Sequence, residues 1–279
     1  MKLLTRILVG AVALIWNATA FSAPTLVQSA TPVNAASSAS TSISLSGVAS
    51  GDYLILQIVT GADPALSSVT DSTGDTVASA VPFVSITGAV MSLGVYYVHV
   101  VTPGPHTIAV ALGAAQNTTL FLSEYSGIAS TGAVDAVSAV NSVASGVTSS
   151  ITTAAISPTA NGDLIIFAIG QTVSGDTFSA YGSGFTQQQI QNASGPSGAW
   201  ASVVQATAAP ISGSATSSTT NAWGAAVVAF KAASAAPSQK GGMFFADNFR
   251  PKIPVVAAAM FMPLSWTINR RNKRAGERR

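Results

Sequence analysis

The acidic residues of a predicted turn are the first candidates for chemistry in this chain. Asp71 and Asp75 lie on either side of Gly74, and a tight turn there could direct carboxylate oxygens toward Ca²⁺. The third acidic residue and the distal glutamate of an EF-hand loop are absent, and Asx-turn hydrogen bonds explain the same residues without a metal. The sequence therefore leaves two alternatives, a calcium site at Asp71 and Asp75 or a structural turn.

The remaining ionisable residues do not form a recognisable catalytic motif. His99 falls within a predicted strand, His106 follows a proline turn, and no Gly-x-Ser-x-Gly motif accompanies them. A pair of carboxylates that includes Glu124 could hydrolyse a glycoside. The position that corresponds to Glu124 in the second half of the chain is near Phe230, so the repeat does not indicate a catalytic role for Glu124. We therefore predict structural roles for these residues, no catalytic residue, no cofactor and no enzymatic activity.

Aromatic side chains on a sheet face would form another kind of site, a platform on which sugar rings stack. The aromatic residues to consider are Tyr96, Tyr97, Trp200 and Trp223. Because neighbouring side chains of a strand point to opposite faces, only one of Tyr96 and Tyr97 can be exposed. We favour packing in the core or between lobes for these aromatic residues, and the alternative is a sugar platform with Tyr97 and Trp200 as its candidates.

The distribution of charge excludes one class of partner. No Lys or Arg lies between Ile7 and Phe230, so the positive net charge comes from the two ends of the chain. A protein that binds nucleic acid needs Lys and Arg on its binding face to displace counterions. We therefore expect no nucleic-acid partner. The chain also has no cysteine, which excludes disulfides, thiol nucleophiles and zinc–thiolate sites.

A repeated stretch predicts the fold class. The segment 51–59 is a Gly-Asp turn followed by a continuous apolar run, and the segment 162–170 repeats it. Each copy has the composition of a central β-strand that is buried on both faces. Short, turn-rich strands without helical periodicity surround both copies. The pattern predicts an all-β fold, an antiparallel β-sandwich or jelly roll, built from two repeated units.

Further strands follow from local patterns. Val69–Val77 is predicted to form a β-hairpin whose turn contains Asp71 and Asp75. Separate strands are predicted over Met91–Val101, His106–Leu112 and Thr118–Tyr125. The two units could form separate sandwiches or one merged sandwich, and we favour two packed lobes.

The predicted boundaries also include segments outside the β units. The short apolar run before Ala18-Thr19-Ala20 is typical of a signal peptide with its cleavage site. The apolar run near the C-terminus is followed directly by basic residues, as expected for a membrane-spanning or sorting helix with a cytoplasmic tail. The predicted segments are a signal peptide (1–20), a linker (21–40), the first β unit (41–130), a connector (131–149), the second β unit (150–232), a linker (233–252), a transmembrane or sorting helix (253–269) and a basic cytoplasmic tail (270–279).

The order of linker, apolar helix and Arg-rich end resembles the C-terminal sorting tails of bacterial surface proteins of the PEP-CTERM type. The usual Pro-Glu-Pro motif is absent, and Arg250-Pro251-Lys252-Ile253-Pro254 stands in its place. The body, with its Gly-Asp-apolar runs and Glu124-Tyr125-Ser126-Gly127, looks like uncharacterised exported β-sandwich repeats of bacteria. These resemblances imply retention at the cell envelope.

We therefore expect an exported, envelope-anchored protein at the cell surface, with its body outside the cytoplasm. The expected role is structural, adhesive or surface recognition, with a membrane contact through residues 253–269 and a surface glycan or protein as ligand. One alternative is a carbohydrate-binding module or glycan-active enzyme. Another is a self-associating subunit of a surface layer or filament, because strands with few charges favour edge-to-edge pairing.

Overall fold

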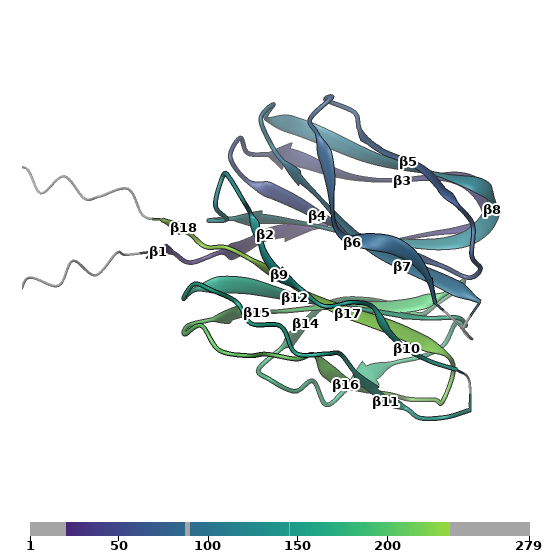
Figure 1. Ribbon diagram of the computed structural model, residues 1–279. Helices are drawn as coiled ribbons and strands as arrows, with labels where there is room; N and C mark the ends of the chain where they lie inside the picture. Colours follow the sequence, from purple (N-terminus) through teal and green to yellow (C-terminus); the bar gives the residue numbers. More distant parts are fainter. Residues whose placement is uncertain (1–20, 87–89, 145, 235–279) are drawn as a thin grey trace, which may run out of the picture. The chain divides into compact units, whose positions relative to one another are not determined.

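The computed structural model describes residues 21–86, 90–144 and 146–234 (Figure 1). Every regular element in these ranges is a β-strand, and all the pairings are antiparallel, which confirms the predicted all-β fold. The strands are β1 (Phe21–Ser22), β2 (Thr25–Ser29), β3 (Val33–Val48), β4 (Tyr53–Thr60), β5 (Leu66–Asp71), β6 (Val77–Ile86), β7 (Met91–His99), β8 (Gly104–Ser126), β9 (Val134–Val137), β10 (Asn141–Val143), β11 (Ser150–Thr152), β12 (Asp163–Gln171), β13 (Phe178–Ser179), β14 (Thr186–Gln191), β15 (Ser197–Gln205), β16 (Ser214–Ser217), β17 (Trp223–Phe230) and β18 (Ala233–Ser234).

The first lobe comprises β2 to β8 and forms the upper part of Figure 1. Its main strand order is β2-β8-β4-β7-β6, and β8 extends over 23 residues. The first part of β8 pairs with β5 and β3, whereas its last part pairs with β4, β3 and β2. The sheet therefore folds over itself into two facing layers, and their apolar side chains enclose a core.

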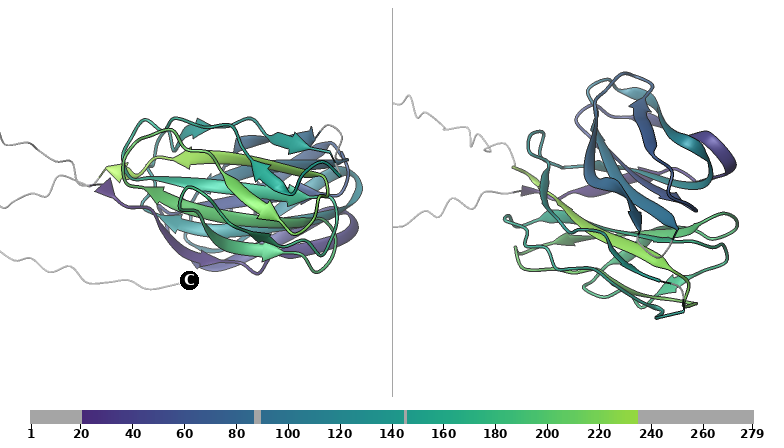
Figure 2. Two further views of the ribbon diagram at one scale, coloured as in Figure 1. Left: turned by 90° about the horizontal axis from the view of Figure 1, so that it is seen from below. Right: turned by 45° about the vertical axis from the view of Figure 1, so that its right-hand side comes forward.

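The second lobe comprises β9 to β17 and forms the lower part of Figure 1. Its larger sheet has the order β10-β17-β12-β15-β14, with β9 also paired to β17. A three-stranded sheet of order β11-β16-β13 covers the outer face of the larger sheet, and the two enclose a second core. The left view in Figure 2 shows that the strands of both lobes run in roughly the same direction.

One layer of the first lobe packs on the larger sheet of the second lobe, and the two form a third core between the lobes. This arrangement explains why β4 and β12 are buried at every position. In β4, Ile55 and Val59 face the other lobe, whereas Leu56 faces the core of its own lobe. In β12, Ile166 faces the first lobe and Phe167 faces inward. Two apolar faces on one strand are therefore the consequence of stacked layers.

The turns before β4 and β12 have the same geometry. Gly51 and Gly162 have φ angles of 91° and 85°, a region that glycine adopts at little cost. Each N–H donates a 2.8 Å hydrogen bond to a carbonyl at the end of the neighbouring strand, Val100 after β7 for Gly51 and Gln205 in β15 for Gly162. The two turns therefore start their central strands in equivalent ways.

Three glycines of the second lobe provide the space into which the first lobe packs. Gly170 of β12 lies opposite Gly198 of β15 on one side and Gly224 of β17 on the other, so the three form a row across the sheet. The absence of side chains lets larger residues of the first lobe approach the backbone. The first-lobe side chains that would meet a Cβ at these positions are Met91 and Val59 at Gly170, Phe121 at Gly198 and Ile86 at Gly224.

Buried hydrogen bonds join the lobes as well. Gln57, which is fully buried, donates from Nε2 to the carbonyl of Ile169 at 2.7 Å. Thr119 donates from its hydroxyl to the carbonyl of Pro196, also at 2.7 Å. Because these polar groups are buried, each bond also avoids the desolvation cost of an unpaired group. The contact between lobes is therefore both apolar and hydrogen-bonded.

Several sequence predictions are wrong at the level of strand pairing. The predicted hairpin over Val69–Val77 does not form, because β5 pairs with β8 and β6 pairs with β7. The turn between them instead crosses from one layer to the other. The two strands predicted over His106–Leu112 and Thr118–Tyr125 are parts of the single strand β8.

The segment boundaries also differ from the predicted ones. Residues 21–40, expected to be a linker, contain β1, β2 and the first half of β3. The connector expected over 131–149 contains β9 and β10, which pair with β17. These polar stretches form strands because they pair at the edges of sheets, where only part of each side chain is buried.

The chain enters and leaves the β-body at the same place. β1 and β18 pair antiparallel, with Phe21 opposite Ser234, and they lie at the left of Figure 1. No helix within the described ranges has the length and apolar character needed to cross a membrane. The predicted signal peptide (1–20), the helix (253–269) and the basic tail (270–279) lie outside the described residues.

Candidate functional site

Acidic side chains gather at the end of the body where β1 and β18 lie. The turn before β4 and the loop after β7 are joined there by a 2.9 Å hydrogen bond from the N–H of Val100 to the carbonyl of Asp52. Six of the eight carboxylates between Ile7 and Phe230 belong to this region. They are Asp52, Asp71, Asp75, Glu124, Asp135 and Asp163.

The first pair of carboxyl groups consists of Asp52 and Glu124. Glu124 is fully buried in β8 and accepts hydrogen bonds from Gln28 Nε2 at 2.5 Å and from the N–H of Ala49 at 3.0 Å. Burial, a hydrogen bond with Glu124 and the charge of Glu124 raise the pKa of Asp52 to about 6. The neighbouring Glu124 therefore favours the protonated form of Asp52.

The second pair consists of Asp163 and Asp135, at the equivalent turn of the second lobe. Burial and the neighbouring Asp135 raise the pKa of Asp163 to about 6, although its Oδ1 accepts a 3.2 Å bond from the N–H of Ala232. Burial alone would raise the pKa of Asp135, but hydrogen bonds from Thr159 and the amine of Lys231, 3.3 Å away, lower it. Of the two carboxyl groups, Asp163 is therefore the one that holds the proton they share.

We expect this second pair to make stability depend on pH. The pKa of Asp163 is higher in the folded state than its ordinary value of 3.8, so the folded protein binds an extra proton between about pH 4 and 6. Folding free energy from this source is present at low pH and lost as pH rises through 6. Asp163→Asn keeps a hydrogen-bond donor toward Asp135 but cannot ionise. We expect the variant to be more stable than the parent at pH 7.5, by on the order of 2 kcal/mol.

Urea unfolding at pH 4.5 and 7.5 measures this effect. The difference between variant and parent should be large at pH 7.5 and small at pH 4.5. Asp63→Asn is the matched control, because Asp63 contacts Ser92 rather than a second carboxyl group, and it should retain the parent's pH dependence. An Asp163→Asn protein that loses stability with pH as steeply as the Asp63→Asn control would show that the shared proton is not at Asp163.

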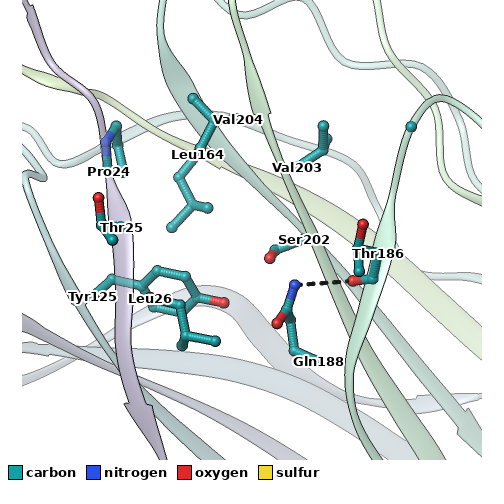
Figure 3. Close-up of a pocket in the computed structure, with 11 residues that line it drawn as sticks. Pro24, Thr25, Leu26, Tyr125, Leu164, Thr186, Gln188, Ser202, Val203 and Val204 are labelled. Atoms are coloured by element: carbon teal, nitrogen blue, oxygen red, sulfur yellow. Dashed lines mark hydrogen bonds between the residues drawn. The ribbon is translucent and has the colours of Figure 1, made fainter.

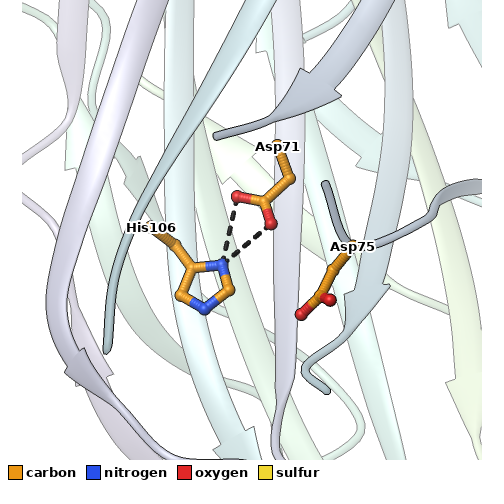
Figure 4. A group of neighbouring side chains, drawn as sticks. All are labelled: Asp71, Asp75 and His106. Atoms are coloured by element: carbon orange, nitrogen blue, oxygen red, sulfur yellow. Dashed lines mark hydrogen bonds and ion pairs between the residues drawn. The ribbon is translucent and has the colours of Figure 1, made fainter. Parts of the chain in front are cut away.

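The structure brings His106 to the two residues predicted as a calcium site (Figure 4). Asp71 lies at the end of β5, Asp75 lies in the turn that follows, and His106 lies near the start of β8. The Nδ1 atom of His106 is 3.0 Å from both carboxylate oxygens of Asp71. One ligand atom from each of the three residues lies within 4.8 Å of the others. The sequence did not connect His106 with this turn because they belong to different strands.

Asp75 holds the loop after β7. Its Oδ2 accepts hydrogen bonds from the N–H groups of Val101 at 2.8 Å and Thr102 at 3.1 Å. Partial burial would raise the pKa of Asp75, but these bonds and the nearby His106 lower it. The carboxylate of Asp75 is therefore ionised and positioned by the backbone.

The proposed sugar platform does not form. Trp200 is 1% exposed and lies in the core between the lobes, so it packs there, as favoured from the sequence, and forms no platform. Tyr97 is half-buried, with its ring edge-on to Phe230 at a centroid distance of 5.7 Å. Trp223 is also buried, in the core of the second lobe. Aromatic residues could be placed in strands by their sequence, but packing between the lobes buries Trp200 and packing within the second lobe buries Trp223.

The other imidazole, His99, has a packing role in the structure. Its ring stacks on Tyr53, with centroids 4.9 Å apart and planes inclined by 25°. The two residues lie opposite each other in β7 and β4. Tyr53 in turn donates from its hydroxyl to the carbonyl of Ala129 at 2.7 Å. This cluster ties the first lobe to the segment that leads into the second.

A groove between the lobes is the candidate binding site for a ligand (Figure 3). It has a volume of about 380 Å³ and lies between β2 of the first lobe and β14 and β15 of the second. Its polar lining comes from Thr186, Gln188 and Ser202, and the hydroxyl of Tyr125 points toward it. The apolar lining includes Pro24, Leu26, Leu164, Val203 and Val204.

Several features of the groove fit a neutral, polar ligand. The lining residues carry no charge and combine hydroxyl and amide groups with small apolar side chains. The Tyr125 hydroxyl accepts a 3.2 Å bond from Trp200 Nε1, so its position is fixed by the core behind it. No pattern in the sequence indicates this site, because its lining comes from strands of two lobes that are far apart along the chain. Comparison with known protein families, with curated proteins and with solved structures finds no match.

Proposed function

We propose that the chain is an exported, envelope-anchored protein of two β-sandwich lobes, with a structural, adhesive or surface-recognition role and no catalysis. The observation that carries this proposal is the pairing of β1 with β18, through which the chain enters and leaves the body at one end. An anchor that follows β18 would present the opposite end of the body to the surroundings. The buried polar contacts between lobes would keep that body rigid.

The roles of the ionisable residues support a non-catalytic function. Glu124 is fully buried and its two oxygens accept bonds from Gln28 and Ala49. His99 is stacked on Tyr53. Groups that are occupied by internal contacts in this way hold the fold together and do not face a substrate.

We further infer that the two lobes are copies of one β unit. The strand order β8-β4-β7-β6 of the first lobe corresponds to β17-β12-β15-β14 of the second. In both, the central strand follows a Gly-Asp turn whose glycine has a positive φ angle. A carboxyl pair accompanies the turn in each lobe, Asp52 with Glu124 and Asp163 with Asp135.

Cell fractionation tests the proposed address. An antibody against the β-body would follow the full chain and a chain that ends before Arg250. We expect the full chain in the envelope fraction and the shortened chain in the medium or the soluble fraction. A shortened chain that stays in the envelope would show that the C-terminal segment is not the anchor.

The groove between the lobes supports a second candidate function, a carbohydrate-binding module. Hydroxyl and amide groups such as those of Thr186, Gln188 and Ser202 are suitable partners for sugar hydroxyls. We expect Gln188→Ala to abolish binding on a glycan array, whereas Gln191→Ala, in the same strand but outside the groove, should leave it intact. Equal binding by the two variants would exclude the groove as the glycan site.

A further inference from the structure

The turn between β5 and β6 and the start of β8 form a preorganised cluster of metal-ligand atoms. Ser72 and Thr107 are joined by two hydrogen bonds, from the N–H of Ser72 to the carbonyl of Thr107 at 3.0 Å and from the N–H of Thr107 to Ser72 Oγ at 2.9 Å. These bonds fix the turn beside His106. As a result Asp71 and His106 are adjacent, and the side chains of both residues are fully buried.

The two ring nitrogens of His106 have different surroundings. Its Nε2 lies 2.8 Å from the carbonyl oxygen of Thr102, which can only accept, so Nε2 carries the proton. The other ring nitrogen, Nδ1, faces both oxygens of Asp71 at 3.0 Å. The hydroxyl of Thr73 donates to Asp71 and lies 3.5 Å from Nδ1. The space between Nδ1 and the Asp71 carboxylate can therefore hold either a proton on the imidazole or a bound cation.

The composition of the body bears on which of the two occupies that space. The body has no Lys or Arg before Lys231, and Lys231 pairs with Asp135 at 3.3 Å. Two carboxylates, those of Asp71 and Asp75, therefore share the cluster with one imidazole and no basic side chain. A proton on the imidazole would leave the cluster with a net negative charge. A divalent cation would neutralise both carboxylates and accept the Nδ1 lone pair.

We propose that Asp71, Asp75 and His106 bind one divalent transition-metal ion, with Zn²⁺ as the best fit. Imidazole nitrogen with carboxylate oxygens is a ligand set for zinc-like ions, whereas Ca²⁺ takes oxygen ligands only. The donation from Nε2 to a backbone carbonyl is the usual support for a metal-binding histidine. Ligands of one tetrahedral Zn²⁺ lie about 3.3 Å apart, close to the 3.0 Å between Nδ1 and Asp71.

The ion would connect the layers of the first lobe. Asp71 and His106 belong to paired strands of the outer layer, whereas Asp75 leads into β6 of the layer that faces the second lobe. A metal bound by all three fastens the turn that crosses between layers. This role suits a chain that has no cysteine for a disulfide.

Metal titration of the full-length, EDTA-treated protein tests the site. We expect ZnCl2 to raise the unfolding temperature and to bind with a stoichiometry of about one by native mass spectrometry, and CaCl2 to have at least tenfold weaker affinity. Co²⁺ should give the visible absorption bands of a low-symmetry, four- or five-coordinate site with a nitrogen ligand. His106→Gln and Asp75→Asn should each weaken Zn²⁺ binding by at least tenfold.

Two comparisons make the result decisive. Asp63→Asn removes a carboxylate elsewhere in the first lobe and should bind Zn²⁺ as the parent does. Asp75 lies at the rim of the cluster and is only partly buried, so Asp75→Asn should stay folded even if His106→Gln does not. Absence of Zn²⁺ binding in the parent, equal Zn²⁺ affinity in parent and Asp75→Asn, or tighter binding of Ca²⁺ than of Zn²⁺ would each overturn the proposal.

Discussion

Replacement of Trp200 by alanine is expected to lower the free energy of unfolding by about 3–5 kcal/mol. The side chain is 1% exposed and belongs to the core between the lobes, so its removal leaves a cavity that rigid strands on both sides cannot close. The variant also loses the 3.2 Å hydrogen bond from Nε1 to the hydroxyl of Tyr125. Because both residues lie between the lobes, the loss should weaken the contact of one lobe with the other.

Urea or thermal unfolding of Trp200→Ala and Trp200→Phe measures the two contributions separately. Trp200→Phe retains most of the apolar volume but removes the hydrogen bond and part of the ring system, so its loss should be about 1–2 kcal/mol. A Trp200→Ala protein with the stability of the parent would contradict the buried position. Loss of glycan binding without loss of stability would instead return Trp200 to the role of a sugar platform.

Gly198→Val is expected to destabilise the protein by about 3 kcal/mol, although valine favours strands in general. A Cβ at Gly198 would lie 2.8 Å from Cε2 of Phe121 and 3.0 Å from the carbonyl oxygen of Ile169. Phe121 is fully buried in β8, so its ring has no free space into which it could move. The substitution therefore pushes the lobes apart at the row of glycines.

Gly113→Val is the matched control for this change. Gly113 lies at an exposed position of β8, where a Cβ would meet Ala65 at an ordinary distance of 3.4 Å. Its effect on stability should be within about 0.5 kcal/mol. A second test combines Gly198→Val with Phe121→Leu, which removes part of the obstructing ring. The double variant should be more stable than the sum of the single changes predicts, and simple additivity would show that the two residues do not compete for the same space.

These two changes act on the same feature, the contact between larger sheets. Trp200→Ala removes a side chain that fills the contact, and Gly198→Val adds a side chain at a position that has room only for glycine. If the groove is a binding site, these two changes should affect stability and leave ligand binding unchanged. The residues that line the groove, among them Gln188 and Thr186, do not belong to the core. Variants of the core should therefore alter unfolding, and variants of the groove should alter binding alone.

The sequence by itself determined the all-β class and the two central strands. Continuous apolar runs after Gly51-Asp52 and Gly162-Asp163 report burial on both faces, and burial leaves a local trace in residue type. The charge distribution, with no Lys or Arg between Ile7 and Phe230, is likewise evident from the sequence alone. The sequence also indicates that Asp71 and Asp75 belong to one turn, since they lie within a few positions of each other.

Only the tertiary structure decided which distant residues meet. The partners of Asp52, Asp163 and the Asp71 turn are Glu124, Asp135 and His106, and each lies on another strand or loop. Strand pairing and the stacking of layers depend on contacts between residues far apart along the chain, which the period of a single strand does not encode. For the same reason only the tertiary structure decided that Trp200 lies in the core between the lobes and that the turn predicted to close a hairpin crosses between two layers.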